Sequence, residues 1–401
     1  MELIIIIGIL LALLYNFVNG LNNAGNSVAT IVATRALRPF HALILAALCN
    51  IAGPFLFTTA IARTIGTGVI KSSALIPETL VVALFCTIFL LVIFTAEGFP
   101  ISASHALIGS MAGSSLAAFG FSSIIWPSAG MIHDVAMAGL AGAAVGALCL
   151  SVIFRILNGP AWLGAAAGAV GGFSVIIVTL MAAGSLKITG LLAIFVFLVV
   201  SPVIGFLAGF LLDILVSYIF RFSRQSTRNR IFQPLQIITG GIQAAGRGAN
   251  DGLHATGVIA ALFIAGGLAD GFYAPAWVVA ASALAVGAGT IFGGWNVTTR
   301  IAKGITRIRP LQGFCASAAG GLVITSLTIT GIPTSSTHII SGSIVGVGAT
   351  RGKNSVDWKV VREIVTTWII TFPLAVTISA LFYIIVSILL KTRLVFPGFT
   401  W

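Results

Sequence analysis

Long apolar segments separated by short polar links make up most of the 401-residue chain. Most of these segments are about 17–25 residues long, which is the length of a helix that crosses a lipid bilayer. They do not alternate apolar and polar residues, as the strands of a membrane-spanning barrel do. The pattern therefore predicts an all-α integral membrane protein with about 12 transmembrane helices in the lipid bilayer.

The expected spans include two short ones that are rich in Ser and Gly, which predicts re-entrant segments, and a long one that polar residues interrupt. The short spans are 102–119 and 335–349, and the interrupted span is 234–264. The full set is 3–19, 40–61, 78–97, 102–119, 133–154, 162–183, 190–212, 234–264, 276–295, 311–330, 335–349 and 364–389.

The composition supports a membrane location. Only 7% of the residues are charged and 58% are hydrophobic, whereas about a quarter of a soluble chain is charged. The net charge of +12 does not indicate a nucleic-acid partner, because Lys and Arg cluster in short links such as 221–233. Such links lie on the cytosolic side of membrane proteins. We therefore expect a multi-pass protein of the cytoplasmic (inner) membrane with both termini outside.

Two polar motifs each occur twice along the chain. The stretch "GLNNAGN" (20–26) aligns with "GANDGLH" (248–254), and "PISASHALIGSMAG" (100–113) aligns with "PTSSTHIISGSIVG" (333–346). The offsets of 228 and 233 residues are similar enough for both pairs to belong to one duplication. In the expected topology the first half starts outside and the second half starts inside, so the repeats are inverted.

The duplication divides the chain into four parts. We expect a first inverted repeat at 1–155, connecting transmembrane helices at 156–220, a cytosolic basic loop at 221–233 and a second inverted repeat at 234–401. Inverted repeats with polar, interrupted segments at matching places are typical of secondary transporters, whose site lies near the middle of the membrane. We therefore expect broken or re-entrant helices at the site.

The first motif pair supplies oxygen atoms of the kind that bind a hard cation such as Na⁺. Glycine tolerates positive φ, so we expect helix breaks at both copies, where protein groups satisfy the freed backbone. If Na⁺ is the coupling ion, its expected ligands are Asn22, Asn23, Asn250 and Asp251. The residues predicted to bind the coupling ion, Na⁺ or H⁺, are Asn22, Asn23, Asn26, Asn250, Asp251 and His254.

The second motif pair supplies hydroxyl groups. Pro100 and Pro333 suit the first turn of a helix, and helix N-termini attract anions through free N–H groups and the positive end of the helix dipole. Two such half-helices that meet would bind a tetrahedral oxyanion. The predicted substrate-binding residues are Ser102, Ser104, Ser335, Ser336, Thr337, Asn22, Asn250 and Asp251.

A cation site beside an oxyanion site is the arrangement of a symporter, because the cation partly neutralises the anion and so couples their binding. An anion channel is the more remote alternative, since its flux would not depend on a cation gradient. The sequence contains no G-x-S-x-G, H-E-x-x-H or P-loop motif. We therefore expect neither enzymatic activity nor a cofactor.

Both motif pairs resemble the signatures of the inorganic phosphate transporter (PiT) family, G-x-N-D-x-x-N in both halves together with P-x-S-x-[ST]-H. The resemblance covers both halves and nearly the whole chain. It implies a sodium- or proton-coupled phosphate symporter that imports phosphate through a core built from both repeats, and it implies a homodimer. It also implies that the first motif binds cations and phosphate and that the second helps to hold phosphate.

Three positions depart from the family pattern. Asn23 stands where the family has aspartate, and this loss of an acceptor keeps a sulfate permease of the same family open, because sulfate needs only donors. Asp251 remains as an acceptor and favours phosphate. His254 lies three residues after Asp251 on the same helix face, and the two are hypothesised to bind a proton in place of one Na⁺. Glu97 is hypothesised to supply the charge missing at position 23.

Three further polar residues adjoin the motifs. His105 and His338 are expected to orient the chain through hydrogen bonds rather than to contact the ion. Arg247 abuts the second copy of the first motif, and one interpretation of it is an anion gate.

Overall fold

The computed structural model describes residues 2–57, 60–156, 158–293, 297–298, 304–332 and 334–389. Within these ranges the chain is almost entirely helical, and its only β-type pairing is two isolated bridges. The helices longer than one or two turns are α1 Glu2–Ala33, α2 Pro39–Leu56, α3 Ala60–Thr67, α4 Pro77–Ala96, α5 Ala103–Phe119, α6 Ala129–Ile156, α7 Ala161–Ala182, α8 Gly190–Ile219, α9 Gln225–Asp251, α10 Leu253–Ala265, α11 Ala276–Phe292, α13 Pro310–Ile329, α14 Ser336–Ala349 and α15 Trp358–Leu389.

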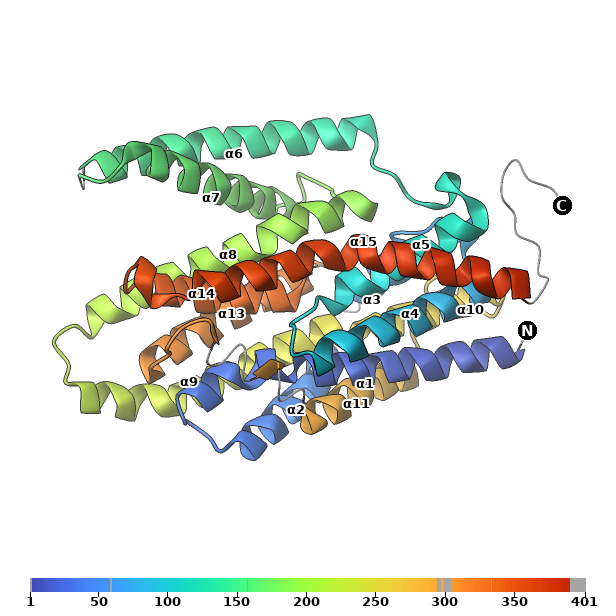
Figure 1. Ribbon diagram of the computed structural model, residues 1–401, viewed down its shortest axis with the longest axis horizontal. Coiled ribbons are helices and arrows are strands. Elements are labelled where there is room, and N and C mark those ends of the chain that lie inside the picture. Colours follow the sequence, from blue (N-terminus) through green and yellow to red (C-terminus); the bar gives the residue numbers. More distant parts are fainter. Residues whose placement is uncertain are drawn as a thin grey trace.

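The predicted all-α class is confirmed. Eight helices in the described ranges are long and apolar enough to cross a membrane, namely α1, α2, α4, α6, α7, α8, α13 and α15, and α11 is a shorter apolar helix. Each expected span overlaps a helix, because apolar length alone marks most of these segments. The first residue of α1 and the last of α15 lie at the same end of the molecule, opposite the link between α8 and α9 (Figure 1).

The expected helix break at the first motif is wrong. Helix α1 runs without interruption through residues 20–26 to Ala33. At the second copy the helical assignment is interrupted only at Gly252, whose φ of −65° and ψ of −26° remain helical. An intact helix satisfies its own backbone in an apolar environment, so the polar side chains of the motif need no break in order to be accommodated.

Two other boundaries differ from expectation. The basic segment 221–233 is only partly a loop, because α9 begins at Gln225. Helix α5 begins at Ala103, three residues after Pro100, because Ser102 is the N-cap and its Oγ accepts the backbone N–H of His105 at 3.4 Å. Pro333 lies outside the described residues.

The glycines of the first motif serve close helix packing rather than unusual backbone angles. A Cβ atom at Gly20 would meet the carbonyl oxygen of Val286, and one at Gly289 would meet the carbonyl oxygen of Phe17. Helices α1 and α11 therefore cross with their backbones in direct contact, and only glycine permits that approach.

Helices α2 and α9 make a matching crossing. A Cβ atom at Gly53 would meet the carbonyl oxygen of Ala245, and one at Gly248 would meet that of Asn50. Ala245 follows Phe17 by 228 residues, which is the offset of the first motif pair. The two crossings thus hold the two copies of that motif in equivalent packing environments.

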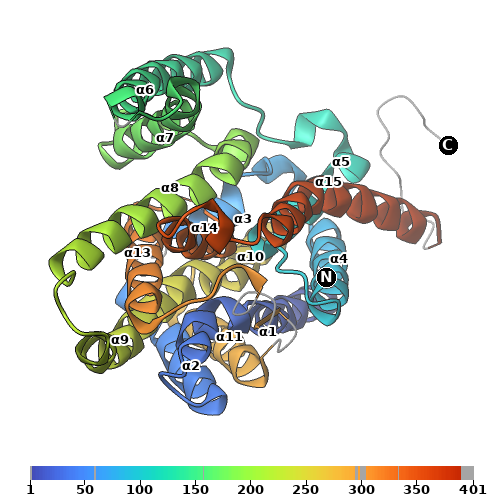
Figure 2. The ribbon, with the colours of Figure 1, turned by 60° about the vertical axis from the view of Figure 1, so that its left-hand side comes forward.

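Helices α5 and α14 each pack against one long helix. Gly109 of α5 lies against the backbone of Phe372 in α15, and Gly342 of α14 lies against the backbone of Pro202 in α8. Helix α8, which lies in the segment expected only to connect the repeats, packs on α14 in the same way as α15 packs on α5. Helices α6 and α7 pair with each other and stand to one side of the other helices (Figures 1 and 2).

Substitution Gly289→Ala is expected to lower the free energy of unfolding by about 1–3 kcal/mol, because the added methyl group overpacks the α1–α11 crossing. The matched control is Gly271→Ala, since a Cβ atom there would meet nothing within 4 Å. Unfolding of the purified protein in mixed detergent micelles measures both. Equal stability of the two variants would contradict the packing role of Gly289.

Candidate functional site

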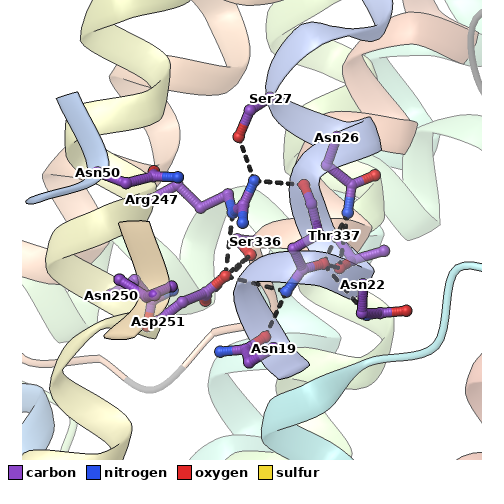
Figure 3. A network of polar contacts seen from close by, with 12 residues as sticks. Asn19, Asn22, Asn26, Ser27, Asn50, Arg247, Asn250, Asp251, Ser336 and Thr337 are labelled. Carbon is purple, nitrogen blue, oxygen red and sulfur yellow. Dashed lines mark hydrogen bonds and ion pairs between the residues drawn. The ribbon is translucent and has the colours of Figure 1, made fainter. Parts of the chain in front are cut away.

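A buried polar centre lies where the middle of α1 and the end of α9 meet the first turn of α14 (Figure 3). The start of α5 adjoins the same centre. Nearly all of its side chains are inaccessible to solvent, and they come from helices that are far apart in the sequence. Its buried members are Asn19, Asn22, Asn23, Asn26, Ser102, Arg247, Asn250, Asp251, Ser335, Ser336 and Thr337.

The first turns of α5 and α14 abut within this centre. The Oγ of Ser102, the N-cap of α5, donates a hydrogen bond to the Oγ of Ser335, the N-cap of α14, at 3.0 Å. The rings of His105 and His338 lie beside each other, with centroids 5.0 Å apart. The structure thus brings together the two half-helices of the second motif pair, with their N-terminal ends facing the same place.

One asparagine of each first-motif copy holds the start of a half-helix. The amide of Asn22 donates to the carbonyl of Ile101 at 3.2 Å, and the amide of Asn250 donates to the carbonyl of Thr334 at 3.0 Å. Each of these carbonyls precedes an N-cap serine by one residue. The two asparagines therefore make the same contact in the two halves of the chain.

The last residue of each first-motif copy crosses to the other half. Asn26 donates to the Oγ1 of Thr337 at 3.1 Å, and the Nε2 of His254 lies 3.5 Å from the Oγ of Ser104. Thr337 follows Ser104 by the offset of the second motif pair. His254 also contacts the hydroxyl of Tyr15 through Nδ1 at 3.1 Å. Ser104 and His254 therefore form a small group apart from the other predicted hydroxyls.

A buried ion pair occupies the middle of the centre. The Nε of Arg247 donates to Oδ2 of Asp251 at 3.1 Å, one helical turn away, and the two side chains are 1% and 2% exposed. The Nη1 of Arg247 donates to the backbone oxygen of Asn23 at 2.6 Å and also to the Oγ of Ser27. The guanidinium therefore ties α9 to the first motif on α1.

The oxygens expected to bind Na⁺ accept hydrogen bonds from protein groups. Asp251 accepts from the Oγ of Ser336 at 2.9 and 3.1 Å and from the amide of Asn23 at 3.2 Å. The Oδ1 of Asn23 accepts from Thr337 at 3.0 Å and from Asn26 at 2.9 Å. Within the described ranges no group of three or more His, Cys, Asp and Glu side chains is placed to hold a metal ion.

Asp251 and His254 share a helix face, bind different partners and make no hydrogen bond to each other, so their binding of a proton stays a prediction. The hypothesis on Glu97 is not supported. Glu97 is exposed at the end of α4, and the side chain that reaches the first motif from there is Thr95, whose Oγ1 donates to Asn22 at 2.9 Å. The charge beside position 23 is instead the cation Arg247.

Of the two histidines of the second motif, His105 makes a hydrogen bond to the backbone of Ile194, as expected, and His338 does not. Both ring nitrogens of His338 lack a hydrogen-bond partner among the described residues, and its ring stacks on Trp368 at 4.0 Å. Sequence reasoning also missed Asn19, which accepts from Asn23 at 2.6 Å. Its position one helical turn before Asn23 was the available signal.

Apolar helices that enclose a buried polar centre, with helix N-termini meeting in it, are the architecture of a helical membrane transporter. A model of the phosphate transporter family matches residues 19–164 and 163–379. The chain is 35% identical over 376 residues to a probable low-affinity inorganic phosphate transporter of Rhizobium meliloti, with 94% of each chain covered. A protein of Bacillus subtilis with the same description is 31% identical, with 97% and 100% covered.

A solved structure described as the sodium-dependent phosphate transporter has the same fold, with a TM-score of 0.67 at 22% identity, covering 97% of this chain and 100% of that one. The protein belongs to the phosphate transporter family, as the family model and both relatives show over nearly its whole length. The family named from the two motif pairs is thus confirmed, as is its multi-pass membrane character.

Because the ion pair is buried, removal of one partner is expected to lower the free energy of unfolding more than removal of both. Arg247→Asn and Asp251→Asn should each lower the free energy of unfolding by about 3–5 kcal/mol, since each leaves a buried charge unpaired. The double variant should be more stable than the sum of the two effects implies. Unfolding in detergent measures all four proteins, and strictly additive effects would contradict a direct pairing.

Proposed function

We propose that this protein is a secondary active transporter that imports inorganic phosphate across the cytoplasmic membrane together with a coupling cation, H⁺ or Na⁺. The observation that carries the proposal is the hydrogen bond between the N-caps Ser102 and Ser335, which joins two helix N-termini beside a buried carboxylate. Family membership and the descriptions of the two bacterial relatives support phosphate as the substrate.

The chemistry of the centre suits an oxyanion. Helix N-termini offer backbone N–H groups and a positive dipole end, and the hydroxyls of Ser102 and Ser335 are further donors at the same place. Phosphate keeps a proton near neutral pH and therefore gains from an acceptor, whereas sulfate does not. Asp251 is such an acceptor and favours phosphate. A sulfate permease is the second candidate, and its support is the amide of Asn23 in place of a carboxylate.

We further propose that the fold consists of two inverted repeats with twelve spans. The matched contacts of Asn22 and Asn250 support the duplication, as do the paired glycine crossings. The packing of α8 on α14 supports its assignment to the first repeat, with α6 and α7 as an inserted pair. We propose that the start of α1 and the end of α15 face outward, because the basic link between α8 and α9 lies at the opposite end of the molecule (Figure 1) and basic links are typical of the cytosolic side. A homodimer remains a prediction from the family resemblance.

Uptake of radiolabelled phosphate into proteoliposomes is expected under an imposed pH or Na⁺ gradient and should be insensitive to excess sulfate. Ser335→Ala should reduce the initial rate about tenfold, because a buried site loses a donor worth about 1–3 kcal/mol. The exposed Ser122→Ala is the control. Sulfate uptake without phosphate uptake would identify a sulfate permease, and flux that ignores both cation gradients would identify a channel.

His254 is proposed as a carrier of the coupling proton, because a histidine changes charge near neutral pH. Its ring also contacts Ser104, which belongs to the first copy of the second motif. In His254→Gln, uptake should no longer respond to an imposed pH gradient, although binding of phosphate persists. The same substitution at the exposed His41 should leave the gradient response intact. An unchanged pH dependence in His254→Gln would rule out this role.

A further inference from the structure

The guanidinium of Arg247 is surrounded by oxygens of three kinds. It donates to the carboxylate of Asp251, to the backbone carbonyl of Asn23 and to the hydroxyl of Ser27. Carboxylate, carbonyl and hydroxyl oxygens are the usual ligands of a hard cation. Two of these three belong to the two copies of the first motif, Asn23 and Asp251, and the third belongs to Ser27, the residue after the first copy (Figure 3). The guanidinium therefore lies where a coupling ion was expected, among oxygens that include two of its predicted ligands, those of Asn23 and Asp251.

The charges of the centre balance without a further ion. Among its described side chains only Asp251 and Arg247 carry a formal charge, and the two are in direct contact. A Na⁺ ion bound to the same oxygens would lie beside the guanidinium, where repulsion between like charges is strong because the surroundings exclude water. The oxygen atoms of Asp251 and Asn23 are thus not available to bind Na⁺ while Arg247 donates hydrogen bonds to them.

The position of Arg247 is asymmetric between the two halves. Arg247 follows Asn19 by 228 residues, the offset of the first motif pair. Asn19 is neutral, and its Oδ1 accepts a hydrogen bond from Asn23. One half of the duplication thus has an amide, with an oxygen that could bind a cation, where the other half has a permanent positive charge.

One end of the guanidinium remains available. The Nη2 atom of Arg247 is buried and has no hydrogen-bond partner among the residues that the structure describes, and the residue as a whole is 0% exposed. A buried, unpartnered N–H group of a cation is costly unless a further acceptor binds there. An oxyanion oxygen is an acceptor that matches this charge.

We propose that Arg247 is the resident cation of the transport site, so that its guanidinium replaces a coupling Na⁺ and its Nη2 donates to the bound oxyanion. Binding and movement of the anion then require no Na⁺. The identity of the anion rests on the proposed function, whereas the replacement of Na⁺ does not. A purely structural ion pair is the alternative, and it makes no prediction about Na⁺.

Thermal unfolding of the purified full-length protein in NaCl and in KCl of equal ionic strength tests the replacement directly. The wild type should unfold at the same temperature in both salts. Arg247→Asn, which introduces the residue found at position 19, should be stabilised by Na⁺ over K⁺ by about 3 °C, because the freed oxygens can then bind the ion. Arg247→Lys keeps the charge and should show no difference.

Phosphate uptake into proteoliposomes supplies the second readout. The wild-type rate should change less than about twofold when K⁺ replaces Na⁺, whereas Arg247→Asn should be at least about tenfold slower in K⁺ and should recover in part in Na⁺. The control is Arg155→Gln, since Arg155 is exposed in the last turn of α6 and lies outside the centre. It should behave as the wild type does.

Three results would overturn the proposal. They are Na⁺-specific stabilisation of the wild type, wild-type uptake that requires Na⁺, and a folded Arg247→Asn variant that does not respond to Na⁺. If Arg247→Asn does not fold, the wild type and Arg247→Lys still decide, because Na⁺-specific stabilisation of either contradicts a resident cation. Absence of phosphate uptake by the wild type would instead refute the proposed function, and the unfolding experiment would still test Arg247.

Discussion

The contact between Arg247 and Asp251 is the interaction on which the polar centre depends. Two charges that are almost fully buried are tolerated only when they are paired and their remaining hydrogen-bonding groups are satisfied. Most of those groups belong to α1 and α14, through Asn23, Ser27 and Ser336. The ion pair therefore fixes the relative position of three helices that lie in different parts of the sequence, and it does so where apolar packing alone would give no directional preference.

The surrounding fold brings the backbone segments close enough for this pairing. Glycines at the α1–α11 and α2–α9 crossings let helix backbones touch, as small residues do in helix packing within membranes. Asn22 and Asn250 then hold the carbonyls that precede the two N-caps. The half-helices are thus positioned by groups of the first motif, which explains why the two motifs are duplicated together.

Much of the fold and part of the centre could be predicted from the sequence. Apolar length marks the helices, and the two motif offsets identify Ser102, Ser335, Asn22 and Asn250 as related pairs. The continuity of α1 could not be predicted, because glycine permits both a helix break and a close crossing, and only the neighbouring α11 decides between them. The contacts of Arg247 with α1 could not be predicted from the sequence either. Spacing along one helix relates it to Asp251, but its contacts with Asn23 and Ser27 come from a helix more than 200 residues away.

The contacts also show where the two halves have diverged. The positions that hold backbone carbonyls are asparagines in both copies, whereas Asn19, Asn23 and Asn26 correspond to Arg247, Asp251 and His254. All three ionisable groups at these paired positions therefore belong to the second half. The first half contributes amides that can donate and accept without a change of charge. The two halves can therefore share the same hydrogen bonds to the backbone although only the second half carries ionisable groups. The shared contacts are made by Asn22 and Asn250, whereas the ionisable groups are three other side chains.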